Sequence, residues 1–346
     1  MVSKLPQPGF EFFRYPSIGG DDWAYLFQIG QIRVLEMRLL TRAALMDMAG
    51  AADFEQAVEL LSGTEYVLPP FNRSLAAVES VLRDRRSAVR ALFNELMINK
   101  RIAALMRWRD DFANLRLGLR RVLTKKPVGD GYSDDGSVPV ERLKQALSEE
   151  NFASLPNHMQ TAVEDALGAY YVGGKEIPRI DYAIDACQSR FNLTEAARIG
   201  SPFLLNFFRI QADLTNIRTM FRLKFRQSDQ RNVFLDGGFL SIDRLTHCLD
   251  VGYEAAGAVF HTTPYHELVA AGAAYLASHG SFLMLERHCE EYMLGFLRST
   301  RAIVTGHQPL VAYLLMKENE IRAVRTVLTA RANGMELRLI LDRLGE

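Results

Sequence analysis

The chain has 346 residues, of which 41 are Lys or Arg and 41 are Asp or Glu, so its formal net charge at pH 7 is zero. This length predicts two or three domains at roughly 150 residues each. Hydrophobic residues make up 48% of the chain and charged residues 24%, which is typical of a folded globular protein and excludes long disorder. Zero net charge also argues against a nucleic-acid partner, which requires a basic face that displaces counterions from phosphates.

The N-terminal segment Met1–Tyr15 contains no apolar core of the kind found in a signal peptide. The three cysteines, Cys187, Cys248 and Cys289, are odd in number and form no Cys-x-x-Cys pair. This pattern excludes a disulfide framework and a zinc ribbon, and it indicates a reducing compartment.

Proline spacing predicts the fold class. No proline occurs in 17–68, 71–126 or 203–263, and each window leaves room for long helices because proline disrupts a helix interior. Apolar residues recur at intervals of three and four in Leu26–Leu45 and Leu75–Leu96, as on one face of a helix. Alternating β-branched runs are nearly absent, so the sequence predicts an all-α protein.

Some helix ends can also be placed from the sequence. Ser201-Pro202 is typical of an N-cap followed by proline at the first helical position, and Gly50 and Gly334 are expected to be C-terminal caps of helices. The segment 127–136 is predicted to be a loop from its glycines and aspartates. It does not fit a calcium loop, because Arg142 would occupy the position of the last carboxylate ligand.

The segment Leu268–Leu285 is a candidate membrane span. It includes no Asp, Glu, Lys or Arg, and its length is at the lower limit for a spanning helix. Polar residues and a glycine interrupt it at 278–281. We therefore expect a buried helix followed by a turn.

A repeat divides the chain. The frame Asp-x-x-Asn-apolar-Arg occurs as Asp111/Asn114/Arg116 and as Asp213/Asn216/Arg218. Two looser copies end at Arg325 and Arg38. A glycine loop and a new helix follow the first two copies in register, at 135–143 and 237–245. The repeat predicts three helical units joined through the motif helices, with boundaries at 21–115, 116–217 and 218–346 after an N-terminal extension, 1–20.

The geometry of the motif allows two interpretations. Residues i and i+3 share one face of a helix, so each Asp and Asn can act together, while the arginine points about 140° away from the Asp. The polar groups could line a partner-binding surface, or they could tie helix ends together at the unit junctions, which we favour because the motif recurs. If such a pair is buried, losing one member should cost about 3–5 kcal/mol.

Catalytic motifs are weak. The glycines before Lys175 do not complete a nucleotide-binding loop, because Glu176 follows the lysine and position 169 is alanine. The ligand-type run 288–291 fans around a helix and cannot converge on one metal. Arg107 and Asp111 stand at the i,i+4 spacing of a helix salt bridge. The residues alone predict a repeated helical scaffold, not an enzyme, with no cofactor and no metal.

Two segments carry a resemblance to a known family. The N-terminal segment Tyr25–Thr41 reads Tyr-Leu-Phe-Gln-Ile-Gly-Gln-Ile-Arg-Val-Leu-Glu-Met-Arg-Leu-Leu-Thr. The C-terminal segment Pro309–Arg325, followed by Ala-Asn-Gly at 332–334, is the more specific. Both resemble the C subunit of V/A-type ATPases, the counterpart of the d subunit in eukaryotic V-ATPases. The resemblance runs from about Asp22 to Leu344, with departures at Gly30 and Gln31.

The resemblance implies a funnel of three similar helical domains in pseudo-threefold arrangement. It implies a non-catalytic rotor adaptor, present as a single copy, that couples central shaft subunits (D and F type) to the membrane proteolipid ring for ATP-linked ion transport. Such a protein is cytoplasmic and peripheral, on the inner face of the membrane, and touches the membrane through the ring only. Its repeated arginines Arg38, Arg116, Arg218 and Arg325 are the expected junction or interface residues.

Two alternatives belong to other functional classes. One is a helical repeat scaffold that binds unrelated protein partners. The other is an all-α enzyme with a metal or small-molecule pocket, which would show perturbed carboxylates in a closed cavity.

Overall fold

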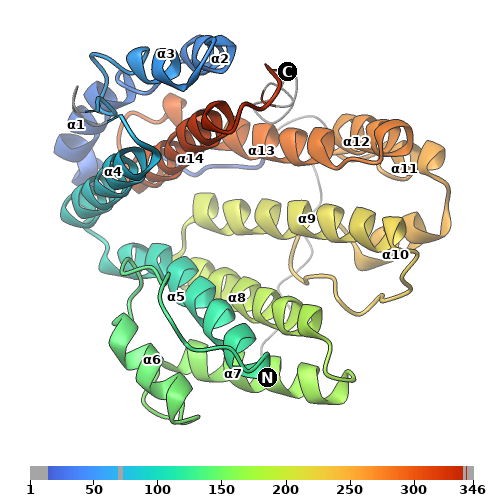
Figure 1. The fold of residues 1–346 in the computed structure, drawn as a ribbon. Coiled ribbons are helices and arrows are strands. Elements are labelled where there is room, and N and C mark those ends of the chain that lie inside the picture. Colours follow the sequence, from blue (N-terminus) through green and yellow to red (C-terminus); the bar gives the residue numbers. More distant parts are fainter. Residues whose placement is uncertain (1–14, 69–72, 338–339, 341–346) are drawn as a thin grey trace. The chain divides into compact units, whose positions relative to one another are not determined.

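The computed structural model describes residues 15–68, 73–337 and 340. The described residues are 70% helical, with 14 α-helices and no strand, so the all-α prediction is confirmed (Figure 1). The chain forms two compact units. We call residues 1–17 and 99–255 the central unit, and residues 18–98 and 256–346 the terminal unit. The division into three domains stays a prediction.

The described helices of the central unit follow one another along the chain. In order these are α5 (Lys100–Leu123), α6 (Val140–Ser148), α7 (Asn157–Val172), α8 (Ile177–Ile199), α9 (Pro202–Phe225) and α10 (Ile242–Asp250). Phe112 and Leu115 of α5, Leu143 of α6, Met159 of α7 and Ile184 of α8 share one buried apolar core. The short helix α11 (Tyr253–Val259) spans the boundary between the two units.

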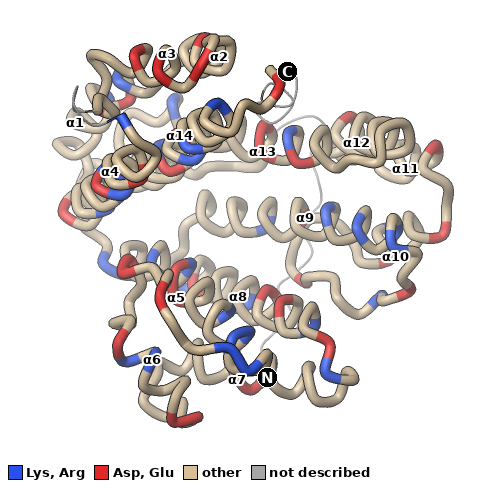
Figure 2. Tube along the Cα trace, in the orientation of Figure 1, with Lys and Arg blue, Asp and Glu red and all other residues tan. Residues whose placement is uncertain are grey.

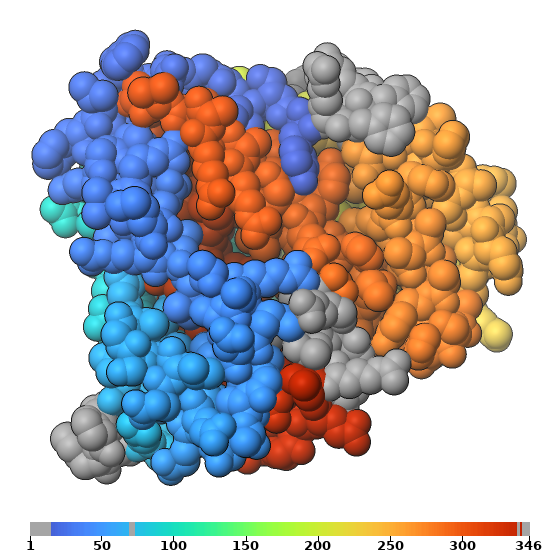
Figure 3. All heavy atoms as spheres, turned by 90° about the horizontal axis from the view of Figure 1, so that it is seen from above, coloured from blue at the N-terminus to red at the C-terminus, as the bar shows by residue number. Residues whose placement is uncertain are grey.

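The terminal unit combines an early and a late part of the chain, residues 18–98 and 256–346. Its helices are η1 (Trp23–Tyr25), α1 (Leu26–Glu36), α2 (Arg42–Gly50), α3 (Phe54–Glu59), α4 (Leu75–Leu96), α12 (His266–His279), α13 (Leu283–Arg298), η2 (Ser299–Ala302) and α14 (His307–Ala332). Val324, Val327 and Leu328 of α14 pack with Met48 and Leu82 in one core. Figure 3 shows the blue N-terminal residues beside the orange and red C-terminal ones.

The proline-free windows were a partial guide to helix length. Window 71–126 holds the long helices α4 and α5, as expected. Window 17–68 is divided into short helices because two side chains cap new starts. The Thr41 hydroxyl accepts the Ala44 N–H at 3.1 Å, and the Asp53 carboxylate accepts the Gln56 N–H at 2.8 Å. Absence of proline permits a long helix but does not require one.

The predicted helix ends differ in outcome. Ser201 caps α9 by accepting the Leu204 N–H at 3.3 Å, and Gly334 follows α14 with φ of 63°, so both predictions are confirmed. The prediction for Gly50 is wrong, because Gly50 is the last residue of α2 and Ala51 caps it in an extended conformation. A chain that leaves its helix extended needs no left-handed glycine.

The apolar stretch 268–285 is not one helix. The helix α12 ends at His279, where Gly280 takes the left-handed conformation with φ of 63°. One face of α12 is buried, including Leu268 and Leu276. None of the helices in the described ranges is long and apolar enough to cross a membrane.

Candidate functional site

The first motif aspartate holds the segment that leads into the next helix. Asp111 is buried on α5, and its Oδ1 accepts the backbone N–H groups of Ser137 at 2.8 Å and Val138 at 3.1 Å. Its Oδ2 accepts the Ser137 hydroxyl. A buried carboxylate is tolerated when several donors satisfy it. Asp111 therefore fixes the backbone just before α6.

The motif asparagine holds the same loop a few residues earlier. Asn114 Nδ2 donates to the carbonyl oxygen of Ser133 at 2.8 Å, and the Ser133 N–H donates to Asn114 Oδ1 at 2.7 Å. The amide thus satisfies both backbone groups of one loop residue. We call this arrangement of Asp, Asn and loop backbone the helix–loop clamp.

The second copy has the same geometry on α9. Asp213 accepts the N–H groups of Phe239 and Leu240, each at 3.0 Å. Asn216 donates to the Leu235 carbonyl at 2.9 Å and accepts the Leu235 N–H at 2.7 Å. The sequence separations of 26, 27 and 19 residues match those of the first copy. The repeated Asp and Asn therefore have one shared structural role.

Both of these clamps need a glycine in the loop. A Cβ on Gly136 would lie 2.5 Å from Asp111 Oδ1, and one on Gly238 would lie closer still to Asp213 Oδ1. Both glycines stand 25 residues after their aspartates. The backbone approaches the short Asp side chain so closely that no side chain fits there.

The third copy of the motif, on α14, contacts a segment from the N-terminal part of the chain. Glu320 on α14 accepts the Leu40 N–H at 2.6 Å, across 280 residues of sequence. Leu40 stands two residues before α2, as Val138 stands two before α6 and Leu240 two before α10. The N-terminal segment thus fills the place that a downstream loop fills in the other copies, and we call this contact between Glu320 and Leu40 the third clamp.

The differences in the third copy have physical reasons. When Leu40 is aligned with Val138 and Leu240, Arg38 stands at the position of Gly136 and Gly238. Glutamate is one methylene longer than aspartate, so the backbone it holds can stand farther away and carry a side chain. Ala323 stands where the other copies have asparagine. The residue that an asparagine would hold corresponds to Leu35, which lies inside α1 and already has helical backbone partners, so no asparagine is needed.

Arg116 and Arg325 pair with neighbouring helices and not with the clamped loops, as their offset around the helix from the first motif residue predicts. Arg116 donates to Asp185 and lies 3.8 Å from Asp181 of α8. Arg325 Nε lies 2.9 Å from Glu79 Oε1 of α4. These pairs are partly exposed, and such ion pairs contribute about 0.2–1 kcal/mol. Burial raises the pKa of Asp185, and the Arg116 charge opposes this shift.

The two remaining arginines differ in setting. Arg218 is partly buried on α9. Arg38 is exposed and follows the end of α1, so it lies on the segment held by the third clamp and not on a motif helix. The structure therefore brings both Asp–Asn pairs to loops, while the role of the four arginines as junction or interface residues stays a prediction.

The predicted salt bridge between Arg107 and Asp111 is wrong. Arg107 Nε donates to the carbonyl oxygens of Gly136 at 3.1 Å and Asp135 at 3.4 Å. Asp111 is already engaged by backbone N–H groups of the same loop. Arg107 thus holds the carbonyl side of the loop that Asp111 holds by its amides.

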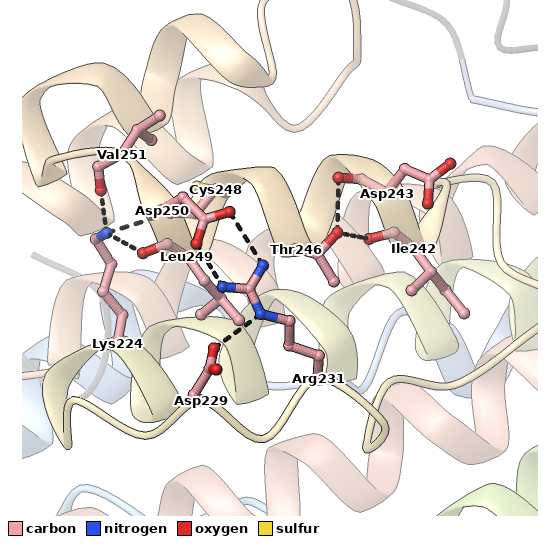
Figure 4. Close-up of polar contacts among 10 residues, drawn as sticks. All are labelled: Lys224, Asp229, Arg231, Ile242, Asp243, Thr246, Cys248, Leu249, Asp250 and Val251. Carbon is pink, nitrogen blue, oxygen red and sulfur yellow. Dashed lines mark hydrogen bonds and ion pairs between the residues drawn. The ribbon is translucent and has the colours of Figure 1, made fainter.

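A lysine that sequence reasoning missed caps α10. Lys224 Nζ on α9 donates to the carbonyls of Cys248 at 3.2 Å and Leu249 at 3.1 Å, and also to that of Val251 (Figure 4). A cation at the last carbonyls of a helix satisfies orphan acceptors and complements the helix dipole. No spacing rule could reveal it, because its acceptors are backbone atoms.

The C-terminal signature contains buried charges on α14, one of the helices where Figure 2 shows both signs of charge. Lys317 Nζ lies 2.6 Å from Glu320 Oε1 and 2.9 Å from Glu65 Oε2. The Tyr66 hydroxyl donates to Glu320 at 2.6 Å, and burial together with the Glu320 charge raises the pKa of Tyr66. Glu318 pairs with Arg90 at 2.7 Å. These contacts hold α14 to the N-terminal segments.

Within the described ranges, no group of three or more His, Cys, Asp or Glu side chains is placed to hold a metal ion. Cys289 of the run 288–291 is buried, and His288 lies 3.6 Å from Glu291 as a surface pair. The polar groups that the sequence singles out are therefore engaged in holding helices and loops.

The repeated clamps place this chain in a class of helical proteins in which a side chain of one long helix holds the segment that leads into another helix. The model of one family, described as ATP synthase (C/AC39) subunit, matches residues 29–343. The chain belongs to this family, and its resemblance to the C subunit of V/A-type ATPases is confirmed.

Relatives of this chain align with it over nearly its whole length. The C subunit of the V-type sodium ATPase of Enterococcus hirae is 24% identical over 323 residues, which cover 90% of this chain and 95% of that protein. The C subunit of the A-type ATP synthase of Thermococcus kodakarensis is 21% identical over 93% of this chain and 90% of its own length. That of Thermococcus onnurineus is 23% identical over the same shares.

Proposed function

We propose that this chain is a non-catalytic rotor adaptor of a V/A-type ATPase, which couples the central shaft to the membrane proteolipid ring. The observation that carries the proposal is the family match over residues 29–343. The relatives are named as C subunits of an ATPase and of ATP synthases. In this role the chain is a single copy on the inner face of the membrane, touching the membrane through the ring.

The side chains support a mechanical role. The motif carboxylates and amides are buried against loop backbone, as Asp213 and Asn216 illustrate. Buried polar groups with satisfied hydrogen bonds favour one rigid arrangement. Rigid packing of helices and loops within a unit suits the transmission of force between partners, whereas an enzyme would need reactive groups open to a substrate.

The direct test is a pull-down of the tagged chain from detergent-solubilised membranes. We expect the shaft subunits of D and F type and the proteolipid to elute together with it. Recovery of unrelated proteins without any rotary ATPase subunit would support a general helical scaffold and contradict the proposal.

A functional test uses membranes whose ATPase lacks this chain. We expect ATP hydrolysis to persist while ATP-driven ion transport is lost, and we expect added full-length chain to restore transport. Unchanged transport without the chain would contradict a coupling role.

Arg218 distinguishes the two interpretations of the motif arginines, of which we favour junction integrity. Arg218→Ala should then lower the melting temperature of the isolated chain. If Arg218 instead contacts a partner, the variant should keep its melting temperature and lose assembly with the shaft. Arg322→Ala is the control, because Arg322 is an exposed arginine on α14 whose contact with Glu290 is 3.4 Å.

A further inference from the structure

The first helix of the terminal unit exposes an unusual apolar face. Trp23 is 69% exposed, Phe27 is 72% exposed and Met37 is 78% exposed. Leu26 and Val34 are also exposed, while Tyr25, Ile29 and Ile32 on the opposite side are buried. We call Trp23 of η1, the α1 residues Leu26, Phe27, Gly30 and Val34, and Met37 directly after the helix the outer face of α1.

The spacing of this face fits packing against another helix. Phe27, Gly30 and Val34 within α1 and Met37 directly after it alternate steps of three and four, as in the seam of a heptad pattern. Trp23 lies in the 3-10 turn η1 that leads into the helix. Scattered apolar side chains on a surface need no explanation, but a contiguous stripe on one helix marks an interaction site. The outer face contains no charged residue.

The face is symmetric about its glycine. Trp23 and Met37 each stand seven residues from Gly30, and no atom lies within 4 Å of a Cβ built at Gly30. Two copies of α1 in antiparallel orientation can therefore cross at Gly30, where their backbones approach closely. Trp23 of each copy would then pack against Met37 of the other, as a two-fold interface requires.

The charges beside the face favour the same orientation. Asp21 and Asp22 lie exposed before its N-terminal end, and Arg38 lies exposed after its C-terminal end. An antiparallel pair places the carboxylates of one copy next to Arg38 of the other, whereas a parallel pair would place like charges together. The same carboxylates disfavour an anionic lipid surface as the occupant.

We propose that the chain outside its complex forms a two-fold dimer through the outer face of α1, in antiparallel register centred on Gly30. The inference concerns the unassembled chain and does not depend on the proposed rotor function. The dimer buries the apolar side chains of the outer face as long as the chain is not assembled into a larger complex.

Sedimentation velocity of the purified full-length chain over a concentration series tests the association. We expect a monomer–dimer equilibrium in the wild type. Phe27→Glu should raise the dimer dissociation constant about 30-fold or more, as the loss of a central interface residue does. The control Val172→Glu changes a side chain that is 91% exposed at the end of α7 and should leave the equilibrium unchanged.

Gly30→Leu separates association from folding. The added side chain meets open space in the monomer, so the melting temperature should not fall, while the dimer should weaken because the helices can no longer approach. A wild-type chain that stays monomeric throughout, or a dimer that Phe27→Glu and Gly30→Leu leave intact, overturns the proposal.

Disulfide cross-linking tests the register. The native Cys187, Cys248 and Cys289 are buried, so they give little background. Gly30→Cys alone should form a cross-linked dimer, while Trp23→Cys and Met37→Cys should cross-link only when mixed. Cross-linking of Trp23→Cys with itself indicates a parallel pair and overturns the proposal. The proposal is also overturned if the wild-type chain is monomeric and binds phosphatidylcholine–phosphatidylserine vesicles in a flotation assay.

Discussion

The Glu320 carboxylate on α14 accepts the backbone N–H of Leu40 at 2.6 Å and so joins the last long helix to the segment before α2. The same carboxylate accepts the Tyr66 hydroxyl at 2.6 Å and pairs with Lys317 at the same distance. One buried side chain thus connects three parts of the terminal unit. Its length matters as much as its charge, because the backbone it holds carries Arg38 where the other copies have glycine.

Glu320→Asp should therefore destabilise the chain by about 1–3 kcal/mol, because the shorter carboxylate leaves the Leu40 N–H unpaired. Arg38→Gly in the same chain should restore part of this loss, since the backbone can then approach. Urea unfolding of the two single variants and the double variant gives the coupling energy. Strict additivity would show that side-chain length and the residue at position 38 are independent.

Gly238→Ala should destabilise the chain by about 1–3 kcal/mol, because the new Cβ overlaps the Asp213 carboxylate. Gly168→Ala is the matched control within α7, where nothing lies within 4 Å of an added Cβ, and it should stabilise by about 0.5–1 kcal/mol. Thermal denaturation of both variants compares them directly. Equal effects of the two substitutions would contradict the close approach at Gly238.

Asn216→Ala should leave the N–H and C=O of Leu235 without their partner, at a cost of about 1–3 kcal/mol for each buried group. Amide hydrogen exchange at Leu235 should accelerate before global unfolding. The reverse change, Ala323→Asn, should give no stabilisation, because the counterpart Leu35 lies inside α1. A gain from Ala323→Asn would mean that our register for the third copy is wrong.

Lys224→Met should destabilise α10, because three carbonyl groups at its end lose a charged donor. We expect a loss of about 1–3 kcal/mol. The neighbouring Arg231 bridges Asp229 at 2.8 Å and Asp250 at 2.5 Å on the surface. Arg231→Met should destabilise the chain less than Lys224→Met, because its ion pairs are exposed to solvent, and a larger effect for Arg231 than for Lys224 would contradict the cap.

Thiol reactivity should report the integrity of the cores. Burial raises the pKa of Cys187 and Cys248 to about 11, so little thiolate is present near neutral pH. We expect slow labelling by a thiol reagent in the native chain and fast labelling of all three cysteines in denaturant. Fast native labelling at pH 7 would show that these cores open readily.

The fold class and the recurrence of the motif were predictable from the sequence, because proline spacing and the Asp and Asn positions are local patterns. The matching glycine loops even indicated the register of Gly136 and Gly238. The sequence could not show that these glycines meet the motif carboxylates, because that contact depends on how the loop folds back.

Contacts between side chains and backbone groups were the main feature that the sequence did not predict. Every residue other than proline offers the same backbone donor and acceptor, so nothing in the sequence marks Leu40 or Cys248 as a partner of Glu320 or Lys224. The same reason explains the error at Arg107, whose acceptors are loop carbonyls and not the carboxylate four residues away. At Asp111 both carboxylate oxygens are engaged by donors of the loop.

The third clamp also sets an order of events during synthesis. Residues 18–98 are synthesised before residues 99–255, but the α14 residue that holds Leu40 is synthesised 280 residues after it. At roughly 5–20 residues per second, they wait for tens of seconds while the central unit can already fold. Nascent chains stalled before residue 307 should therefore protect residues 99–255 from protease and leave residues 18–98 open to cleavage and to chaperones.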